Sequence, residues 1–209
     1  MKKYKVYLFD FDGTLVDTFP ALIYVFQESF AQYGIDVSKE ECYDFAREPL
    51  NESFERKGGD MTVFWDFVDV INFYLNGQKS IQLTTPYEDT EKTLEILHKM
   101  GVIAGIVTSN NVPHIKDVLE NHHLDYKFMQ VFVGNQECIT PKPSPKPIQT
   151  ALEMINYQGD LKDVVYVGDG RNDALAAKNA GVDAVLLDRD NIYQDEPYTI
   201  IHSLLELFE

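Results

Sequence analysis

The chain has 209 residues, 44% of them hydrophobic and 25% charged, and carries a formal net charge of −16. This composition is typical of a globular protein with one core and a modest insertion, or of two small domains. The negative charge argues against nucleic acid or an anionic membrane as a partner, so an anionic ligand would need positive charge supplied within its site.

The cysteines and the apolar stretches exclude further classes. Cys42 and Cys138 lie far apart in the sequence without metal-ligand spacing, so we expect neither a disulfide nor a zinc site. The apolar run behind the N-terminus breaks at Asp10, too early for a signal peptide, and no stretch approaches transmembrane length. These features predict a soluble cytoplasmic protein.

The first predicted element is a short strand at residues 6–9, which is apolar, β-branched and aromatic. It is followed by Asp10, Asp12 and Gly13. Two carboxylates at the end of a buried strand repel each other and resist desolvation unless they bind a cation or change protonation state.

Residues 18–84 read as an all-helical insertion. Aromatic and aliphatic residues recur at helical spacing over 19–33 and 64–75, and Ser38 with Glu41 forms a capping box that predicts another helix start. Residues 47–60 are predicted to be a polar connection. Trp65 and its aromatic neighbours are predicted to form the core of the insertion.

From residue 85 onward, predicted helices and strands alternate. Helices are expected to begin at Thr85-Pro86, before Ile115, at Ser144-Pro145, after Asp173 and at Ile201. Strands are expected at 102–107, 129–133, 164–167 and 184–187. This alternation predicts an α/β fold, a Rossmann-like parallel sheet with helices on both faces, formed by residues 1–17 and 85–209 with residues 18–84 as a separate helical domain.

Polar residues follow the predicted strands directly. Because ligands of open parallel sheets bind outside the carboxyl ends of the strands, we expect these groups to meet at one edge. They are Asp10 and Asp12, then Thr108, Ser109 and Asn110, then Lys142, and finally Asp169 and Asp173.

These clusters carry a family resemblance. The segment from Asp10 to Asp17 resembles the first motif of the haloacid dehalogenase-like hydrolase superfamily, and Thr108 is similar to its second. Lys142 in Lys-Pro-Ser-Pro matches the third motif, and Gly168-Asp169 with Asp173 matches the fourth. The helical insertion resembles the C1 cap, and the whole pattern is closest to the phosphoglycolate phosphatase-like branch.

The resemblance implies a Mg²⁺-dependent phosphatase acting on a small phosphorylated metabolite. It implies that Asp10 attacks phosphorus to form an aspartyl-phosphate, and that Asp12 acts as general acid and base. Mg²⁺ would be held by the Asp10 side chain, the Asp12 carbonyl and Asp169, with Asp173 as a ligand through water or as an anchor.

The remaining family roles concern the phosphoryl group. The Thr108 hydroxyl and the amides of Ser109 and Asn110 would donate to its oxygens, and the Lys142 ammonium would neutralise charge on the nucleophile and the substrate. Arg47 stands where relatives place a specificity loop and would bind a second acidic group of the substrate, or else lie solvated at a helix end.

Several alternatives stay open at this stage. A β-phosphoglucomutase-type mutase uses the same two aspartates, and a pyrophosphatase or nucleotidase fits the same motifs. A catalytically silent phosphate-binding protein is the non-enzymatic alternative, disfavoured because Asp10, Asp12 and Lys142 are all present. The substrate, the effect of Gly170 after Asp169 and the choice between monomer and homodimer are left undetermined.

Overall fold

The structure is a computed structural model and describes residues 2–209. The chain forms two compact units, one of Met1–Asp17 with Pro86–Glu209 and one of Thr18–Thr85. The chain leaves the first unit after the two-residue strand β2 (Val16–Asp17) and returns to it at β3 (Thr85–Pro86). No helix within residues 2–209 is long and apolar enough to cross a membrane.

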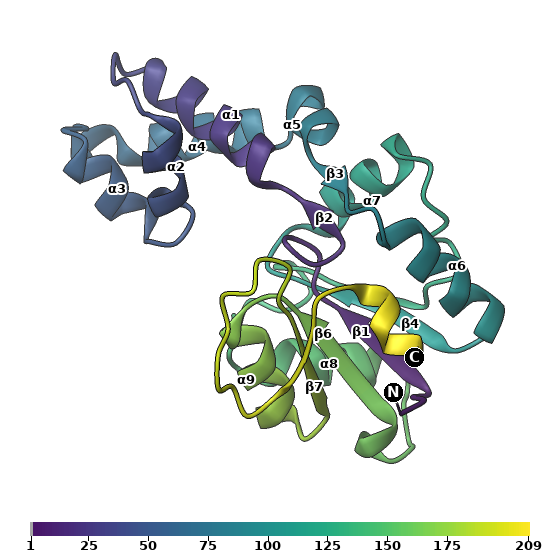
Figure 1. Cartoon of the computed structure of the whole chain (residues 1–209). Helices are drawn as coiled ribbons and strands as arrows, with labels where there is room; N and C mark the ends of the chain where they lie inside the picture. The colour runs from purple at the N-terminus through teal and green to yellow at the C-terminus, as the bar shows by residue number, and fades with distance from the viewer. Residues whose placement is uncertain (1) are drawn as a thin grey trace. The chain divides into compact units, whose positions relative to one another are not determined.

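A six-stranded parallel sheet organises the first unit, as the alternation of the sequence predicts (Figure 1). Its order is β5-β4-β1-β6-β7-β8, so successive strands are added on one side of β1 and then on the other, while all strands stay parallel. The strands are β1 (Val6–Phe9), β4 (Ile103–Val107), β5 (Val131–Val133), β6 (Val164–Gly168), β7 (Asp183–Leu187) and β8 (Thr199–Ile201).

The register of the central strands sets the position of the site. Phe9 of β1 lies opposite Ile106 of β4 and Val167 of β6. The chain therefore leaves these three strands at the same edge, with Asp10, Thr108 and Asp169 next in line. An edge of this kind, at a reversal of strand order, is where ligands bind in open α/β sheets.

Helices cover both faces of this sheet. Helices α8 (Lys146–Met154) and α9 (Arg171–Ala180) pack on one face, against apolar side chains of β1, β4, β5 and β6. On the other face the 3-10 helix η3 (Leu204–Phe208) lies over β1, with the Phe208 ring 6.1 Å from that of Tyr7. Helix α6 (Thr90–Met100) packs against η3, and α7 (Val112–Asn121) follows β4.

The second unit is all-helical and has an aromatic core. Its helices are α1 (Phe19–Ala31), α2 (Lys39–Phe45), α3 (Leu50–Arg56), η1 (Met61–Val63), α4 (Phe64–Leu75) and α5 (Gln78–Leu83). Phe54 and Phe67 stack with their centroids 4.2 Å apart, and Phe30 lies 4.8 Å from Phe67. Ser38 and Glu41 form the predicted capping box at the start of α2.

The structure corrects two predictions within this helical unit. Part of the segment expected to be a polar connection, residues 47–60, is helix α3, which buries Phe54 completely. Trp65 is 77% exposed and Phe73 is 74% exposed, whereas Phe67 is fully buried. Helical periodicity marks α4 as amphipathic, but Trp65 and Phe73 lie on the face that its own unit leaves uncovered.

Two helix boundaries of the α/β unit also differ from expectation. The helix expected from Thr85 begins at Thr90, because the intervening segment is held by Leu15, whose carbonyl accepts from the Tyr87 N–H at 3.2 Å. The expected terminal helix from Ile201 is strand β8 followed by η3, since Ile201 pairs with Leu187 in the sheet.

Candidate active site

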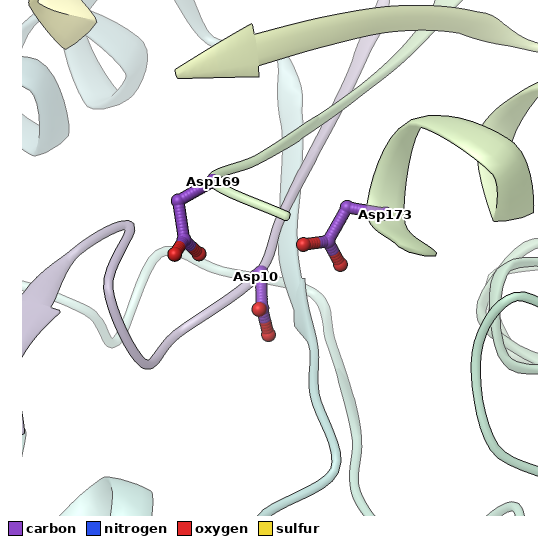
Figure 2. Close-up of side chains that lie close together, drawn as sticks. All are labelled: Asp10, Asp169 and Asp173. Atoms are coloured by element: carbon purple, nitrogen blue, oxygen red, sulfur yellow. The ribbon is translucent and has the colours of Figure 1, made fainter. Parts of the chain in front are cut away.

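Three carboxylates meet at the carboxyl edge of the sheet. Asp10 follows β1, Asp169 follows β6, and Asp173 lies in the first turn of α9; one oxygen of each falls within 4.8 Å of the others. Figure 2 shows the three side chains close together, with Asp169 and Asp173 on either side of Asp10. Asp10 and Asp173 are buried, at 7% and 5% exposure, and Asp169 is half-buried.

A glycine permits the close approach of the first loop to Asp169. Gly13 has φ of +76°, and a Cβ at this position would lie only 2.4 Å from Asp169 Oδ2. Any side chain would therefore both strain the backbone and collide with the carboxylate. The next residue, Thr14, donates its hydroxyl to Asp169 Oδ1 at 3.2 Å. The Asp-Gly-Thr sequence thus brings the first and fourth polar clusters together.

Lys142 is the positive charge of this cluster. Its ammonium lies 3.0 Å from Asp10 Oδ1 and 2.6 Å from Asp173 Oδ1. Asp173 is further fixed by the Gly170 N–H, which donates to its Oδ2 at 2.9 Å at the start of α9. Gly170 therefore contributes its backbone amide to the anchoring of Asp173.

The cluster holds one ammonium for three carboxylates, and the pKa values reflect burial together with the excess negative charge. Burial raises the pKa of Asp10, Lys142 opposes this, and Asp173, Asp12 and Asp169 raise it further. The pKa of Asp169 is raised to about 6, first by burial and then by Asp173. Burial alone would lower the pKa of Lys142, but Asp10 and Asp173 raise it above its ordinary value.

A divalent cation fits this arrangement. The cluster offers only oxygen atoms, which are the ligands that Mg²⁺ prefers. Its unbalanced charge, visible in the raised pKa values, is what a bound cation would neutralise. Asp10, Asp169 and Asp173 are thus the side chains that could hold it.

The Asp12 carboxylate faces the second polar cluster. Its Oδ2 accepts from the Thr108 hydroxyl and from the Asn110 side-chain amide, each at 3.4 Å. Burial raises the pKa of Asp12, and hydrogen bonding from Asn110 and the nearby His114 lower it in part. The two aspartates of the first loop therefore have different surroundings.

The turn after β4 orders the Thr108 side chain. The Asn110 backbone N–H, which the family resemblance assigns to the phosphoryl group, donates to Thr108 Oγ1 at 3.2 Å in this structure. Thr108 is 6% exposed, and Ser109 is exposed. Together with Lys142 they line part of a cavity of about 140 Å³.

Arg47 is the remaining candidate from the sequence, and His114 is a further residue, which interacts with Asp12. Arg47 belongs to the helical unit and has an exposed side chain just before α3. His114, in the first turn of α7, is only 3% exposed, and burial lowers its pKa while Asp12 raises it.

The structure adds residues that sequence reasoning missed. Arg189 follows β7, and its guanidinium donates to the Thr14 carbonyl at 3.0 Å and to both oxygens of Asp89.

Two tyrosine hydroxyls also reach the site. The Tyr193 hydroxyl donates to the Asp169 carbonyl at 2.8 Å. The Tyr166 hydroxyl lies 3.2 Å from both Lys142 Nζ and Asp173 Oδ1. Arg189 could have been predicted, because polar residues that follow parallel strands meet at one edge of the sheet. Tyr166 could not, because its sequence position is that of an ordinary buried strand residue.

Comparisons with known proteins show the family of the chain. A family model described as haloacid dehalogenase-like hydrolase matches residues 7–187. A phosphoglycolate phosphatase of Vibrio parahaemolyticus is 29% identical over 98% of this chain and 95% of its own length. A pyrophosphatase PpaX of Bacillus pumilus is 32% identical over 83% of this chain and 78% of its own.

Solved structures show the same fold. A Clostridium difficile protein has a TM-score of 0.85 at 25% identity, covering 100% of both chains. A subfamily IA hydrolase from Geobacter sulfurreducens has a TM-score of 0.79 at 21% identity, covering 98% of this chain and 95% of its own. The chain therefore belongs to the haloacid dehalogenase-like hydrolases, as an enzyme of their phosphatase type.

Proposed function

We propose that the protein is a Mg²⁺-dependent phosphatase that hydrolyses a small phosphorylated metabolite in the cytoplasm through an aspartyl-phosphate on Asp10. The observation that carries this proposal is the Asp10 carboxylate itself, which lies 3.0 Å from Lys142 in a cluster of buried acids. Mg²⁺ held by Asp10, Asp169, Asp173 and the Asp12 carbonyl would polarise the phosphoryl group and offset its negative charge.

In the first half-reaction, a carboxylate oxygen of Asp10 attacks phosphorus, an O–P bond forms and the bond to the leaving oxygen breaks. The protonated Asp12 carboxyl gives its proton to that oxygen. Its surroundings support this role, because burial raises its pKa and so favours the protonated form. The leaving group departs as an alcohol.

In the second half-reaction, Asp12 is the base. Its carboxylate accepts a proton from a water molecule, whose oxygen attacks phosphorus while the bond to Asp10 breaks. Phosphate leaves and both aspartates return to their initial states. Proton transfer of this kind typically accounts for about 10²–10⁴-fold in rate.

The neighbouring polar groups hold the phosphoryl group in both steps. Lys142 acts as a fixed positive charge, since its ammonium already binds Asp10 and Asp173. The Thr108 hydroxyl and the amides of Ser109 and Asn110 would donate to phosphoryl oxygens, with the Asn110 N–H exchanging its Thr108 partner for substrate.

The relatives suggest two substrate classes. Those named phosphoglycolate phosphatases suggest a phosphomonoester that carries a carboxylate, and those named pyrophosphatases PpaX suggest pyrophosphate. We propose the former as the leading candidate and pyrophosphate as the second. The helical unit would act as a C1 cap, and the exposed Arg47 would bind the substrate carboxylate in bidentate fashion.

The test is a phosphate-release assay with purified protein, using phosphoglycolate, pyrophosphate, a hexose phosphate and an aryl phosphate. We expect hydrolysis that requires Mg²⁺ and is abolished by EDTA. Isomerised hexose phosphate without free phosphate would favour a mutase instead. Phosphate binding without turnover of any of these compounds would contradict the proposal.

A further inference from the structure

We propose that Tyr166 is a positioning residue whose hydroxyl fixes the Lys142 ammonium and ties it to the strand end that presents Thr108. The inference rests on the proposed function, because it assigns Tyr166 a part in placing the charge beside the nucleophile. Tyr166 lies in β6, three residues before Asp169, and is 1% exposed.

The Tyr166 hydroxyl has three polar neighbours from three parts of the chain. It donates to the Val107 carbonyl of β4 at 2.7 Å, lies 3.2 Å from Asp173 Oδ1 in α9, and accepts from Lys142 Nζ at 3.2 Å. A phenol has one proton, and the shortest contact assigns it to Val107. Its oxygen lone pairs then remain to accept from Lys142.

An ammonium group has three N–H donors, and the Lys142 ammonium has three polar neighbours. It donates hydrogen bonds to Asp173 Oδ1 at 2.6 Å and to the Tyr166 oxygen at 3.2 Å, and it forms an ion pair with Asp10 Oδ1 at 3.0 Å. The two carboxylates alone would leave the ammonium free to tilt between them. The third contact fixes its direction relative to the Asp10 oxygen.

The same hydroxyl links the ammonium to the phosphoryl-binding turn. Val107 is the last residue of β4, and Thr108 follows it directly. Through one oxygen atom, Tyr166 therefore holds both the charge that faces Asp10 and the backbone from which Thr108 projects. A displacement of about 1 Å in such groups can cost on the order of 10²-fold in rate.

The ring and the hydroxyl of Tyr166 can be separated experimentally. Lys142 Nζ also lies 5.8 Å from the ring centroid, a contact that Tyr166→Phe retains along with the apolar packing. Tyr7→Phe is the matched control: Tyr7 is 1% exposed in the adjacent strand β1, and its hydroxyl accepts from the Tyr4 N–H at 3.2 Å. Each variant removes one buried hydroxyl from the same sheet.

The kinetic test compares these variants in Mg²⁺-dependent aryl phosphate hydrolysis. We expect Tyr166→Phe to lower kcat by about tenfold or more while KM changes by less than about threefold, because the lost contact orients a group that acts on the transition state. Tyr7→Phe should leave both constants at the wild-type values. Equal kinetics for the two variants would overturn the positioning role.

A second measurement does not depend on turnover. A double-mutant cycle in urea unfolding compares Tyr166→Phe, Lys142→Met and the variant with both changes. A second cycle uses Tyr7→Phe in place of Tyr166→Phe. We expect the Tyr166 cycle to be non-additive and the Tyr7 cycle to be additive. An additive Tyr166 cycle would overturn the inference. If the Tyr166 cycle is non-additive but the protein hydrolyses none of the phosphate compounds, the contact between Tyr166 and Lys142 stands and the proposed function is refuted.

Discussion

The two units of the chain both have apolar cores but place their charged groups differently. The helical unit buries rings against rings and has its charged groups on the surface, where Glu48 pairs with Arg56. The α/β unit gathers three buried or half-buried carboxylates and one ammonium at the edge of its sheet. The aromatic core therefore favours folding, whereas the acidic cluster opposes it unless a cation is bound. Substitutions in the two regions should separate activity from stability.

The largest expected effect is that of Asp10→Asn on turnover. Removing the nucleophile should lower kcat by at least about 10⁴-fold, the order seen when a nucleophile is removed from a catalytic unit. Because a like charge leaves a crowded acidic cluster, the unfolding midpoint of the metal-free protein should stay equal or rise. Both are measured with aryl phosphate and by thermal unfolding.

The control for this variant is Asp36→Asn, since Asp36 is an exposed aspartate of the helical unit. It should change neither turnover nor the unfolding midpoint. Turnover of Asp10→Asn near the wild-type level would remove the basis for covalent catalysis, and a lower midpoint would show that the cluster stabilises the fold.

Asp12→Asn should have a smaller effect that depends on the leaving group. An alkyl phosphate needs a proton on its leaving oxygen, so its hydrolysis should slow by about 10²–10⁴-fold. The first half-reaction with an aryl phosphate needs little protonation and should slow much less. Burst kinetics with both substrates measure this difference, and an equal loss for both would argue against Asp12 as the general acid.

Phe54→Ala tests the other region. Phe54 is fully buried, and its ring lies 4.2 Å from that of Phe67 and 6.0 Å from that of Phe30. Truncating a buried Phe typically costs about 3–5 kcal/mol. Urea unfolding should show this loss, while Phe73→Ala on the exposed face should fall within about 0.5 kcal/mol of wild type. Similar losses for both would mean that the exposed face is covered in solution.

The pH dependence of stability sharpens the comparison. The folded-state pKa of Asp169 is raised to about 6, so the folded state binds its proton more tightly than the unfolded chain. The contribution of Asp169 to the free energy of unfolding is greatest at low pH and is lost as the pH rises through about 6. Metal-free protein should therefore lose stability as the pH rises from about 4 to about 6.5, and Asp169→Asn should flatten that slope.

Saturating Mg²⁺ should reverse this behaviour, because a bound cation favours the charged carboxylates. The rise in the thermal unfolding midpoint on adding Mg²⁺ should then be larger at higher pH. Thermal unfolding with Mg²⁺ and with EDTA across this range measures it. A gain that is independent of pH in wild type would place the cation away from Asp169.

The smallest predicted effect is that of Arg47→Ala. If this exposed arginine binds the substrate carboxylate, KM for phosphoglycolate should rise by about tenfold at most, with KM for an aryl phosphate unchanged. Arg56→Ala, which also removes an arginine from the helical unit, is the control. Equal changes for both substrates would exclude Arg47 from substrate recognition.

Short-range patterns predicted much of the sheet and its edge. The strand before Asp10, the Asp-Gly-Thr turn and the polar groups after each strand follow from local chemistry and from the common edge of parallel strands. The metal-binding and catalytic roles of these groups are still proposals. Gly13 shows why the local pattern is informative, since both its φ and its distance from Asp169 require glycine.

The features that escaped prediction depend on contacts between distant segments. Asp89 lies just before α6, but its carboxylate binds Arg189, which is one hundred residues away, and gives α6 no side-chain cap. Tyr166 and Tyr193 reach the site through their hydroxyl groups, which no spacing rule reveals. Trp65 and Phe67 fit the same helical pattern, and only packing decides which ring is buried.

The central claim is that Asp10 carries the phosphoryl group during turnover. Its most direct test is an acid quench of the enzyme with Mg²⁺ and substrate, followed by mass spectrometry of the peptide that contains residues 5–17. The account predicts one phosphoryl group on Asp10 in wild type and none in Asp10→Asn. Free phosphate released at the wild-type rate with no phosphorylated Asp10 at any quench time would contradict it.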